Sequence, residues 1–557
     1  MSVVGSTSEY VANGGDRAFD GVSQSASDHS RAERAGAHSL TEPILGKWQR
    51  IQLSLLAFAW ITGLASFFLW WFQEGHIAGP IRFIVSTLLI VWTLIVPGYF
   101  LFFVARMRRT SPTVMIPSHW RVAMVTTRAP SEPFDVVMRT LEAMLEQRYP
   151  HETWLADEQP TPEILEWCRA KGVHVVSRHG VAEYHRNEWP RRTKCKEGNL
   201  AYFYDRHGYD QFDFVVQLDS DHVPAAGYLE AMLRPFVDDG VGYVSAPSIC
   251  DSNAATSWSA RGRLFSESVM HGPLQAGYSN GFAPLCIGSH YAVRTRALRE
   301  IGGLGPELAE DHSTTLMMNG NGWRGIHAID AIAHGEGPPT LSACITQEFQ
   351  WSRSLMVVFL TLLPKYWSRL PWRLRLQFLF CELWYPLFSC SMLAGLSIPV
   401  IAICSREPWV NVSYLDFVLH TLPLAILSLS IVACLKTRGL LRPCDSPLFS
   451  WEVGLFQIVR WPWVVYGTTM GVITTLTGKN VEFRVTPKGG ENSMSLQWRL
   501  LLPYCAIVIL TFLPTLFVQD AGMAQGYFFF NIIAQVMYVA ALFGIVLVNR
   551  YENSRAV

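Results

Sequence analysis

The sequence predicts an α/β domain inserted into an α-helical transmembrane bundle, and three observations lead to this fold class. Of the 557 residues, 50% are hydrophobic and only 16% are charged, which is typical of membrane proteins. Six apolar runs reach about 20 residues, enough to cross the hydrocarbon core as helices. After the second run, short β-branched strands alternate with helical patterns, which indicates a mostly parallel sheet with helices on both faces.

Charge and cysteine content exclude several classes of protein. Lys and Arg number 45, as do Asp and Glu, so the net charge of +0 gives no reason to expect nucleic acid as a partner. The 11 Cys are scattered without a C-x-x-C pair, and several lie in apolar runs. We therefore expect neither a disulfide framework nor a zinc site.

The first 109 residues are interpreted as a tail and two membrane spans. Residues 1–46 are rich in Ser, Gly, Ala and charge, without apolar periodicity, and predict a disordered tail. This tail lacks the apolar core of a signal peptide. In residues 47–109, Lys47 and Arg50 precede the run 51–72, three arginines follow the run 81–105, and the connector 73–80 has no Lys or Arg. The positive-inside rule places the outer ends of both runs, and the domain that follows, in the cytoplasm.

Residues 110–346 have the character of a soluble domain, long enough for a core of its own. Its predicted strands cover 122–125, 174–176, 214–218 and 242–245, and its clearest helical patterns cover 134–147 and 162–171.

The rest of the chain returns to the membrane. Residues 347–377 mix Trp with Arg and Lys, which favours helices lying in the membrane interface. Within 378–557, the run 451–476 is apolar but contains Glu452 and Arg460, so it is interpreted as interfacial. Spans are predicted at 378–404, 415–435, 500–518 and 528–548.

Two carboxylates directly follow the strand predicted at 214–218. In an open α/β sheet, ligands bind at the carboxyl ends of the strands. Asp219 and Asp221 are two residues apart, so on an extended chain both point the same way. Two such oxygen donors beside a nucleotide diphosphate suit Mg²⁺ or Mn²⁺. A lone D-x-D also occurs in solvated loops, so the interpretation depends on the other motifs.

Four further clusters carry functional groups. Taken singly, each has an alternative explanation: a turn for Asp157-Glu158, a solvated charge for Lys196, a helix cap for Glu310-Asp311, and a membrane-interface anchor for 347–351.

The order and spacing of these clusters resemble those of the processive family 2 glycosyltransferases, above all the cellulose synthase group. That family shows an Asp-Asp pair, K-A-G-N-L, D-x-D-H, T-E-D and Q-x-x-R-W in this order, on a catalytic fold of the GT-A type. The corresponding segments here are 157–158, 196–200, 219–222, 309–311 and 347–351. Further matches are Glu132-Pro133 with T-Y-N-E-P, 285–289 and 302–303 with F-C-G-S…G-G, and 483–489 with the F-x-V-T-x-K gating loop. The resemblance covers about residues 50–550.

The resemblance implies a role for each matched residue. Asp311 would be the general base that takes the proton from the acceptor hydroxyl as it attacks the anomeric carbon. Such a single displacement inverts an α-linked donor, so a β linkage is expected. The other implied roles are nucleotide-sugar binding by Glu132, Asp157, Lys196, Asp219, Gln347, Gln350 and Arg353; metal binding by Asp219 and Asp221; acceptor binding by Trp351, Glu310, Gly288 and Ser289; and gating by Phe483, Val485, Thr486 and Lys488.

The chain departs from the family pattern at three positions. Gln350 replaces the Arg of Q-x-x-R-W, and losing a charge-assisted hydrogen bond costs about 1.5–3 kcal/mol. Our hypothesis is that Arg353, three positions further along a helix, takes over the phosphate contact. Glu158 replaces the second Asp and Ala309 replaces Thr, and both changes are tolerable.

The sequence therefore predicts a multi-pass enzyme of the inner or plasma membrane that polymerises a β-glucan from UDP-glucose and translocates it. Its partners would be the growing polysaccharide, membrane lipid and accessory export subunits. Glu382, Trp384 and Tyr385 are candidates for lining a sugar channel, since ionisable groups at membrane depth suggest function. A PilZ domain, which senses cyclic di-GMP in many bacterial cellulose synthases, is not expected after the last span.

Two alternatives remain open. The product could be another β-polysaccharide, such as a β-1,3-glucan, chitin or hyaluronan, made with a different linkage or an N-acetylated donor. A protein of another class, a transporter or scaffold whose soluble insert only binds nucleotide, would not need Asp311 or Trp351.

Overall fold

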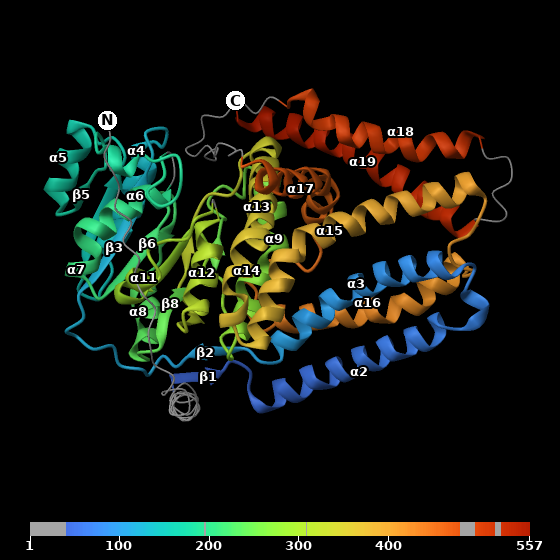
Figure 1. The fold of residues 1–557 in the computed structure, drawn as a ribbon, viewed down its shortest axis with the longest axis horizontal. Helices are drawn as coiled ribbons and strands as arrows, with labels where there is room; N and C mark the ends of the chain where they lie inside the picture. Colours follow the sequence, from blue (N-terminus) through green and yellow to red (C-terminus); the bar gives the residue numbers. More distant parts are fainter. Residues whose placement is uncertain (1–39, 194–195, 308, 479–495, 518–524, 557) are drawn as a thin grey trace, which may run out of the picture.

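The computed structural model of the 557-residue chain describes residues 40–193, 196–307, 309–478, 496–517 and 525–556. An α/β domain forms one end of the molecule and a bundle of long helices forms the other (Figure 1). The predicted fold class, an α/β domain inserted in a helical membrane bundle, is confirmed.

The main sheet of the α/β domain has seven strands and is mostly parallel, as predicted. Only β10 runs against its neighbours β6 and β8. The strand order is β11 (Arg324–His327), β8 (Val241–Ser245), β10 (His290–Arg294), β6 (Phe214–Leu218), β3 (Val122–Arg128), β4 (Glu152–Asp157) and β5 (His174–Val176). Three short strands, β7 (Val223–Pro224), β12 (Ala333–His334) and β9 (Ser248–Ile249), form a second sheet.

Alternating side chains of the central strands enter two separate cores, as the two-residue period of a strand requires. On β3, Val122 and Met124 pack with one core, while Ala123 and Val125 pack with the other. The first core is covered by α4 (Phe134–Leu145), α5 (Pro162–Lys171) and α8 (Tyr228–Leu233). The second is covered by α6 (Lys196–Phe203) and α12 (Glu310–Gly320), and it continues into the membrane helices through Phe378.

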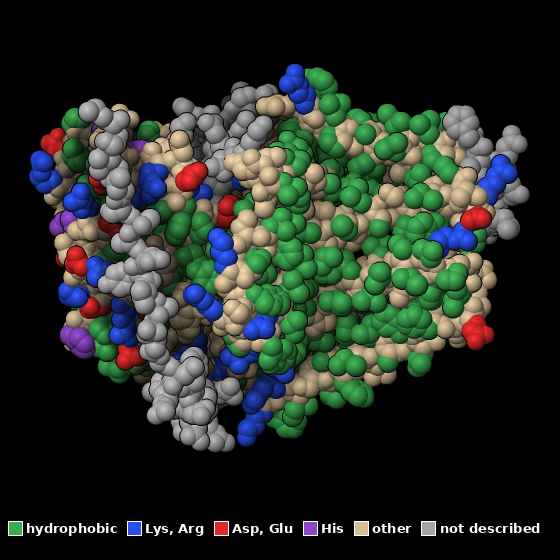
Figure 2. Space-filling view, viewed as in Figure 1, with side chains coloured by type: hydrophobic (Ala, Val, Ile, Leu, Met, Phe, Trp, Pro, Cys, Tyr) green, Lys and Arg blue, Asp and Glu red, His purple; other side chains and the backbone are tan. Residues whose placement is uncertain are grey.

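Among the described residues, six helices are long and apolar enough to cross a membrane, in agreement with the six predicted spans. Hydrophobic side chains gather over this half of the molecule, and Lys and Arg gather where it meets the α/β domain (Figure 2). The six helices are α2 (Lys47–Trp71), α3 (Pro80–Val104), α15 (Trp372–Ser405), α16 (Tyr414–Lys436), α18 (Leu502–Phe517) and α19 (Gln525–Ala556).

Three helices join the two halves: α9 (Trp258–Ser266), α13 (Leu341–Val357) and α17 (Trp451–Thr477). Helix α17, predicted to be interfacial, is not among the six candidate spans. Both charged residues of α17 form ion pairs with the other two joining helices. Glu452 pairs with Arg261 of α9 at 2.9 Å, and Arg460 pairs with Glu348 of α13 at 3.3 Å. The remaining short helices are α7 (Tyr209–Gln211), α10 (Gln275–Tyr278), α11 (Thr295–Glu300) and α14 (Leu363–Tyr366).

The structure differs from the prediction at the end of the N-terminal tail. Residues 41–43 form strand β1 (Thr41–Pro43), which pairs antiparallel with β2 (Arg108–Thr110). The ion pair between Arg109 and Glu42, at 2.9 Å, adds to the backbone pairing. The predicted tail of 46 residues therefore includes an ordered segment next to the first span, while residues 1–39 lie outside the described part.

Candidate functional site

One cavity of about 1420 Å³ runs from the edge of the sheet to the membrane helices. Its polar end lies where the carboxyl ends of β3, β4 and β6 meet the start of β10. Its other end lies against α3 and α15. Eleven predicted site residues line it: Glu132, Lys196, Asp219, Asp221, Gly288, Ser289, Glu310, Asp311, Gln347, Gln350 and Trp351. Asp157 and Arg353 do not line it.

The loop after β6 places Asp219 at the centre of the polar end. The backbone N–H of Asp219 donates to Ser289 O at 2.7 Å, which ties this loop to the start of β10. Lys196 Nζ donates to Asp219 Oδ1 and to Gly288 O, both at 2.6 Å. A cation is thus held between two loops at the sheet edge, beside the carboxylates.

The segment 196–200 is locked in place by contacts that explain its residue types. Asn199 donates to Ala156 O at 2.6 Å, which joins α6 to the end of β4. The carboxylate of Glu197 accepts from the backbone N–H groups of Arg191 and Arg192 at 2.8 and 3.0 Å. A side chain at Gly198 would place its Cβ 2.1 Å from Arg192 O, so only glycine fits. The motif therefore holds the start of α6, and with it Lys196, against the sheet.

Asp219, Asp221 and His222 offer ligand atoms within 4.8 Å of one another. Asp221 Oδ2 accepts the backbone N–H of Glu336 at 2.8 Å, and its Oδ1 lies 3.3 Å from His222 Nδ1. Burial lowers the pKa of His222, but the adjacent Asp221 carboxylate raises it to about 10 overall. The predicted pair of carboxylates fits Mg²⁺ or Mn²⁺ in its chemistry, with His222 orienting Asp221.

Glu132 and Asp157 occupy a neighbouring corner and are both engaged with protein groups. Glu132 accepts from Ser220 Oγ at 2.7 Å and from the backbone N–H of Ala129 at 2.8 Å. Asp157 is fully buried and pairs with Arg128 at 3.0 Å. Burial raises the pKa of Asp157, and the N–H of Gln159 and the charge of Arg128 oppose this. Arg128 lines the cavity, whereas Asp157 does not. The sequence analysis did not single out Arg128.

Glu310 and Asp311 lie in the first turn of α12 and face the cavity together. Burial raises the pKa of both carboxylates, and the neighbouring Asp311 raises that of Glu310 further. The backbone N–H of His312 donates to Asp311 Oδ1 at 2.8 Å. A Cβ on Gly288 would lie 3.3 Å from Asp311 Oδ2, so this carboxylate approaches the loop closely. The arrangement suits a carboxylate that accepts a proton near neutral pH.

Helix α13 presents Gln347, Gln350 and Trp351 to the cavity. Gln347 Oε1 accepts from Arg263 Nη1 at 2.6 Å, and the guanidinium carbon of Arg263 lies 4.2 Å from the centre of the Trp351 ring. Arg263, on α9, was not singled out by the sequence because no local pattern links it to α13. It fixes both the glutamine and one side of the indole.

Arg353 does not line the cavity, contrary to the hypothesis that helical spacing brings it to the phosphate in place of Gln350. Its side chain is buried, and Nε donates to Thr474 Oγ1 of α17 at 3.3 Å. Burial lowers its pKa, and the nearby Glu307 opposes this. The described contacts of Arg353 therefore join α13 to α17.

Of the three predicted channel residues, two line the membrane end of the cavity and one does not. Trp384 and Tyr385 line it, together with aromatic side chains of α3 and α15 such as Trp92, Phe380 and Phe388. Glu382 does not line it; instead, its Oε1 lies 2.7 Å from His312 Nε2. The gating-loop residues Phe483, Val485, Thr486 and Lys488 lie outside the described residues.

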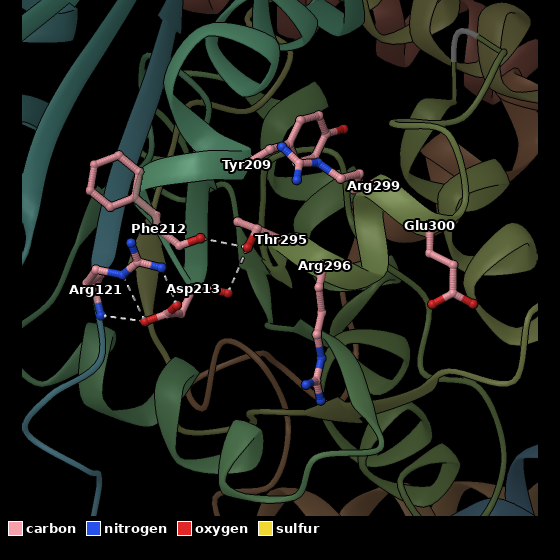
Figure 3. A pocket seen from close by; sticks show the side chains of 8 residues that line it. All are labelled: Arg121, Tyr209, Phe212, Asp213, Thr295, Arg296, Arg299 and Glu300. Carbon is pink, nitrogen blue, oxygen red and sulfur yellow. Dashed lines mark hydrogen bonds and ion pairs between the residues drawn. The ribbon is translucent and has the colours of Figure 1, made fainter.

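A second cavity of about 420 Å³ lies at the opposite ends of β3 and β6, next to Arg121 and Asp213 (Figure 3). Its arginines are paired with acidic side chains: Arg121 with Asp213 at 2.8 Å and Arg299 with Asp210 at 2.5 Å. It is therefore not part of the candidate site.

Comparison with known proteins agrees with the geometry. A family model described as "Glycosyl transferase family group 2" matches residues 214–432. Cellulose synthase 1 of Komagataeibacter xylinus is 23% identical over 394 residues, which cover 67% of this chain and 23% of that protein. The cellulose synthase catalytic subunit (UDP-forming) of Pseudomonas fluorescens SBW25 is 23% identical over 406 residues, which cover 70% and 51%. The chain thus spans about a quarter of the length of the first relative and about half of the second.

Comparison with solved structures finds a mannosyltransferase from Pyrobaculum calidifontis in complex with GDP-Man and Mn²⁺. It is 14% identical, with a TM-score of 0.37, covering 76% of this chain and 100% of that chain. Glucosyl-3-phosphoglycerate synthase from Mycobacterium tuberculosis, with Mn²⁺ and UDP, is 13% identical, with a TM-score of 0.27, covering 41% and 80%. Over residues 214–432 the chain is thus similar to the family 2 glycosyltransferases, and it is similar to cellulose synthases and their catalytic subunits at 23% identity.

Proposed function

We propose that this protein is a processive, inverting glycosyltransferase that builds a β-glucan from UDP-glucose and passes it into the membrane. One observation carries the proposal: a single cavity joins the Asp219, Asp221 and Asp311 carboxylates to an aromatic lining on α3 and α15. A protein that only binds nucleotide needs the first half of this cavity and not the second.

The donor would bind with its diphosphate next to Lys196 and the D-x-D carboxylates. Lys196 is positively charged and lies 2.6 Å from Asp219, so it is placed to contact phosphate oxygens. A divalent metal held by Asp219 and Asp221 would neutralise negative charge that develops on the departing UDP. Glu132 and Arg128 border the same pocket, and they would shape the part that receives the uridine.

Asp311 would act as the general base. It takes the proton from an acceptor hydroxyl as that oxygen forms a bond to the anomeric carbon of the donor sugar. The bond from the anomeric carbon to the diphosphate oxygen breaks, and UDP leaves with the electron pair. A single displacement inverts the configuration, so an α-linked donor gives a β-linked product.

The acceptor would lie on Trp351 and extend toward α15. Aromatic rings stack on the apolar faces of sugars, and Trp384, Tyr385 and Phe388 continue this lining past Trp351. Basic residues flank the outer ends of the first two spans, which supports a cytoplasmic catalytic domain in a cell membrane. Closure by the 483–489 loop and export through accessory subunits remain parts of the proposal.

The test uses purified protein in detergent or lipid nanodiscs, with Mn²⁺ or Mg²⁺ and a panel of UDP-sugars. We expect UDP release with UDP-glucose and an insoluble product that a β-1,4-glucanase digests. Digestion only by a β-1,3-glucanase, or activity only with UDP-N-acetylglucosamine, would favour the other β-polymers.

The Asp311→Asn variant separates the enzyme from the binding protein. We expect this variant to bind UDP with the affinity of the wild type and to lose at least a hundredfold of UDP release, the usual contribution of a general base. A wild-type protein that binds UDP but releases none from any donor would instead favour a transporter or scaffold.

A further inference from the structure

A buried ion pair holds the helix that carries Asp311 against a membrane helix. His312 Nε2 of α12 lies 2.7 Å from Glu382 Oε1 of α15, and the two side chains are 10% and 0% exposed. Among the described residues, no hydrogen-bond donor of good geometry reaches either oxygen of Glu382. The imidazole is therefore the group that offsets this buried carboxylate, since an unpaired charge in such a place is costly.

His312 of this ion pair directly follows the proposed base, Asp311, in the sequence. His312 contributes to Asp311 in two ways, through the 2.8 Å hydrogen bond from its backbone N–H and through its side-chain charge. Burial raises the pKa of Asp311, whereas both contributions of His312 lower it. Burial lowers the pKa of His312, but Glu382 raises it above its usual value. The carboxylate on α15 thus keeps a cation beside Asp311.

Other ionisable groups lie near Asp311, His312 and Glu382 and also influence which of them are charged. Asp311 and Asp219 disfavour the charged form of Glu310, while Lys196 favours the charged forms of both Glu310 and Asp311. The groups that face Asp311, His312 or Glu382 are Glu310 on α12, Lys196 on α6, Asp219 after β6, Cys286 and Tyr291 near β10, and Cys381 on α15. Of the groups on α12 and α15, His312 is the one that can carry a positive charge next to the base.

Resting on the function proposed above, we propose that His312 and Glu382 are positioning residues for the transfer step. Their ion pair fixes the first turn of α12 against α15 and keeps the Asp311 carboxylate ionised where the acceptor enters the membrane. The ion pair thereby connects the helix that carries the general base to α15, which lines the proposed exit of the polymer.

The test measures kcat and the donor KM for UDP release as a function of pH. The proteins are the wild type, Glu382→Gln, His312→Gln, the double variant and the control Glu452→Gln, which changes a carboxylate on α17 paired with Arg261. In both single variants we expect kcat to fall about tenfold near neutral pH, with donor KM within twofold. Because Asp311 must be ionised to accept a proton, losing the neighbouring cation shifts the acidic limb of the kcat profile upward, by about one pH unit.

The double variant should lose no more than the worse single variant, because both changes break one interaction. An acidic limb that stays at the wild-type pH in both single variants, or that moves equally in Glu452→Gln, would overturn the inference. If Glu382→Gln does not fold, His312→Gln, in the α/β domain, carries the same comparison. A wild type that releases no UDP from any donor defeats the proposed function as well, whereas an active wild type with an unmoved limb defeats only the positioning role.

Discussion

At the scale of single residues, Arg263 is the side chain whose role is easiest to separate from folding. It donates to Gln347 at 2.6 Å and stacks on Trp351 at 4.2 Å. The Arg263→Lys variant keeps the charge beside Glu267 but loses the planar fork that makes both contacts. We expect the chain-elongation rate to fall about tenfold, the equivalent of 1.4 kcal/mol, which is within the range of a buried cation–π contact. UDP binding, measured by calorimetry, should stay unchanged; a weaker UDP affinity with a normal elongation rate would contradict this role.

The metal prediction also belongs to this scale. Chelation with EDTA should abolish UDP release, and Mn²⁺ or Mg²⁺ should restore it. Asp221→Asn should lower the metal affinity at least tenfold, because a neutral amide replaces a carboxylate while it can still accept the Glu336 N–H. Asp239→Asn is the control, since its side chain is 88% exposed and lies in another part of the domain. Activity that survives EDTA would rule out the metal site.

At this scale, most of the candidate residues predicted from the sequence line one cavity, and the exceptions arise where side-chain direction matters. The motifs around Asp219 and Asp311 predict residues that line one cavity. The hypothesis for Arg353 rests on a shared helix face, but three residues along a helix turn the side chain by about 60°, and here that turn points it at Thr474. Arg263 and the His312–Glu382 pair depend on contacts between segments distant in sequence, which no local pattern reveals.

At the scale of elements, the close packing of α13 on α17 determines where Gln347 and Trp351 lie. A Cβ at Gly467 of α17 would lie 2.1 Å from Ser352 Oγ and 2.6 Å from Phe349 O of α13. We expect Gly467→Ala to push the helices apart and lower the free energy of unfolding by about 1–3 kcal/mol, with a matching loss of UDP release.

The matched control is Gly454→Ala on the same helix, where nothing lies within 4 Å of the added Cβ. There the substitution should raise stability by up to about 1 kcal/mol, because alanine favours the helix more than glycine does. Thermal unfolding in detergent checks both variants. Equal shifts in the two would show that helix propensity, and not the approach of α13, determines the result.

The four predicted strands are correct to within a few residues, because their burial leaves a clear apolar signal. β5 and β6 begin and end where the pattern predicts. Strand β10 was not predicted, since His290–Arg294 begins and ends with polar residues, and no local pattern indicates its antiparallel direction. This reversal matters for function: it brings the start of β10, preceded by Gly288 and Ser289, to the same edge as Asp219.

At the scale of the whole molecule, composition alone separates the two halves. Long apolar runs predict the six helices, and the strand pattern predicts the inserted domain, so the architecture follows from the sequence. The way in which the two halves are connected does not follow from the sequence. It depends on α9, α13 and α17, whose polar residues pair across the boundary, and on a cavity that no single segment encodes.

We expect changes in the membrane half of the cavity to affect the length of the product and not the rate of the transfer step. Gly395 lines it on α15, about 20 Å along the helix from Glu382, and nothing lies within 4 Å of a Cβ added there. Gly395→Trp should therefore narrow the exit while the catalytic residues stay in place. We expect an initial burst of UDP release near the wild-type rate, followed by arrest with short products. Gly544→Trp on α19, also with an open Cβ and outside the cavity lining, should elongate normally. Full-length polymer from Gly395→Trp would mean that the chain leaves by another route.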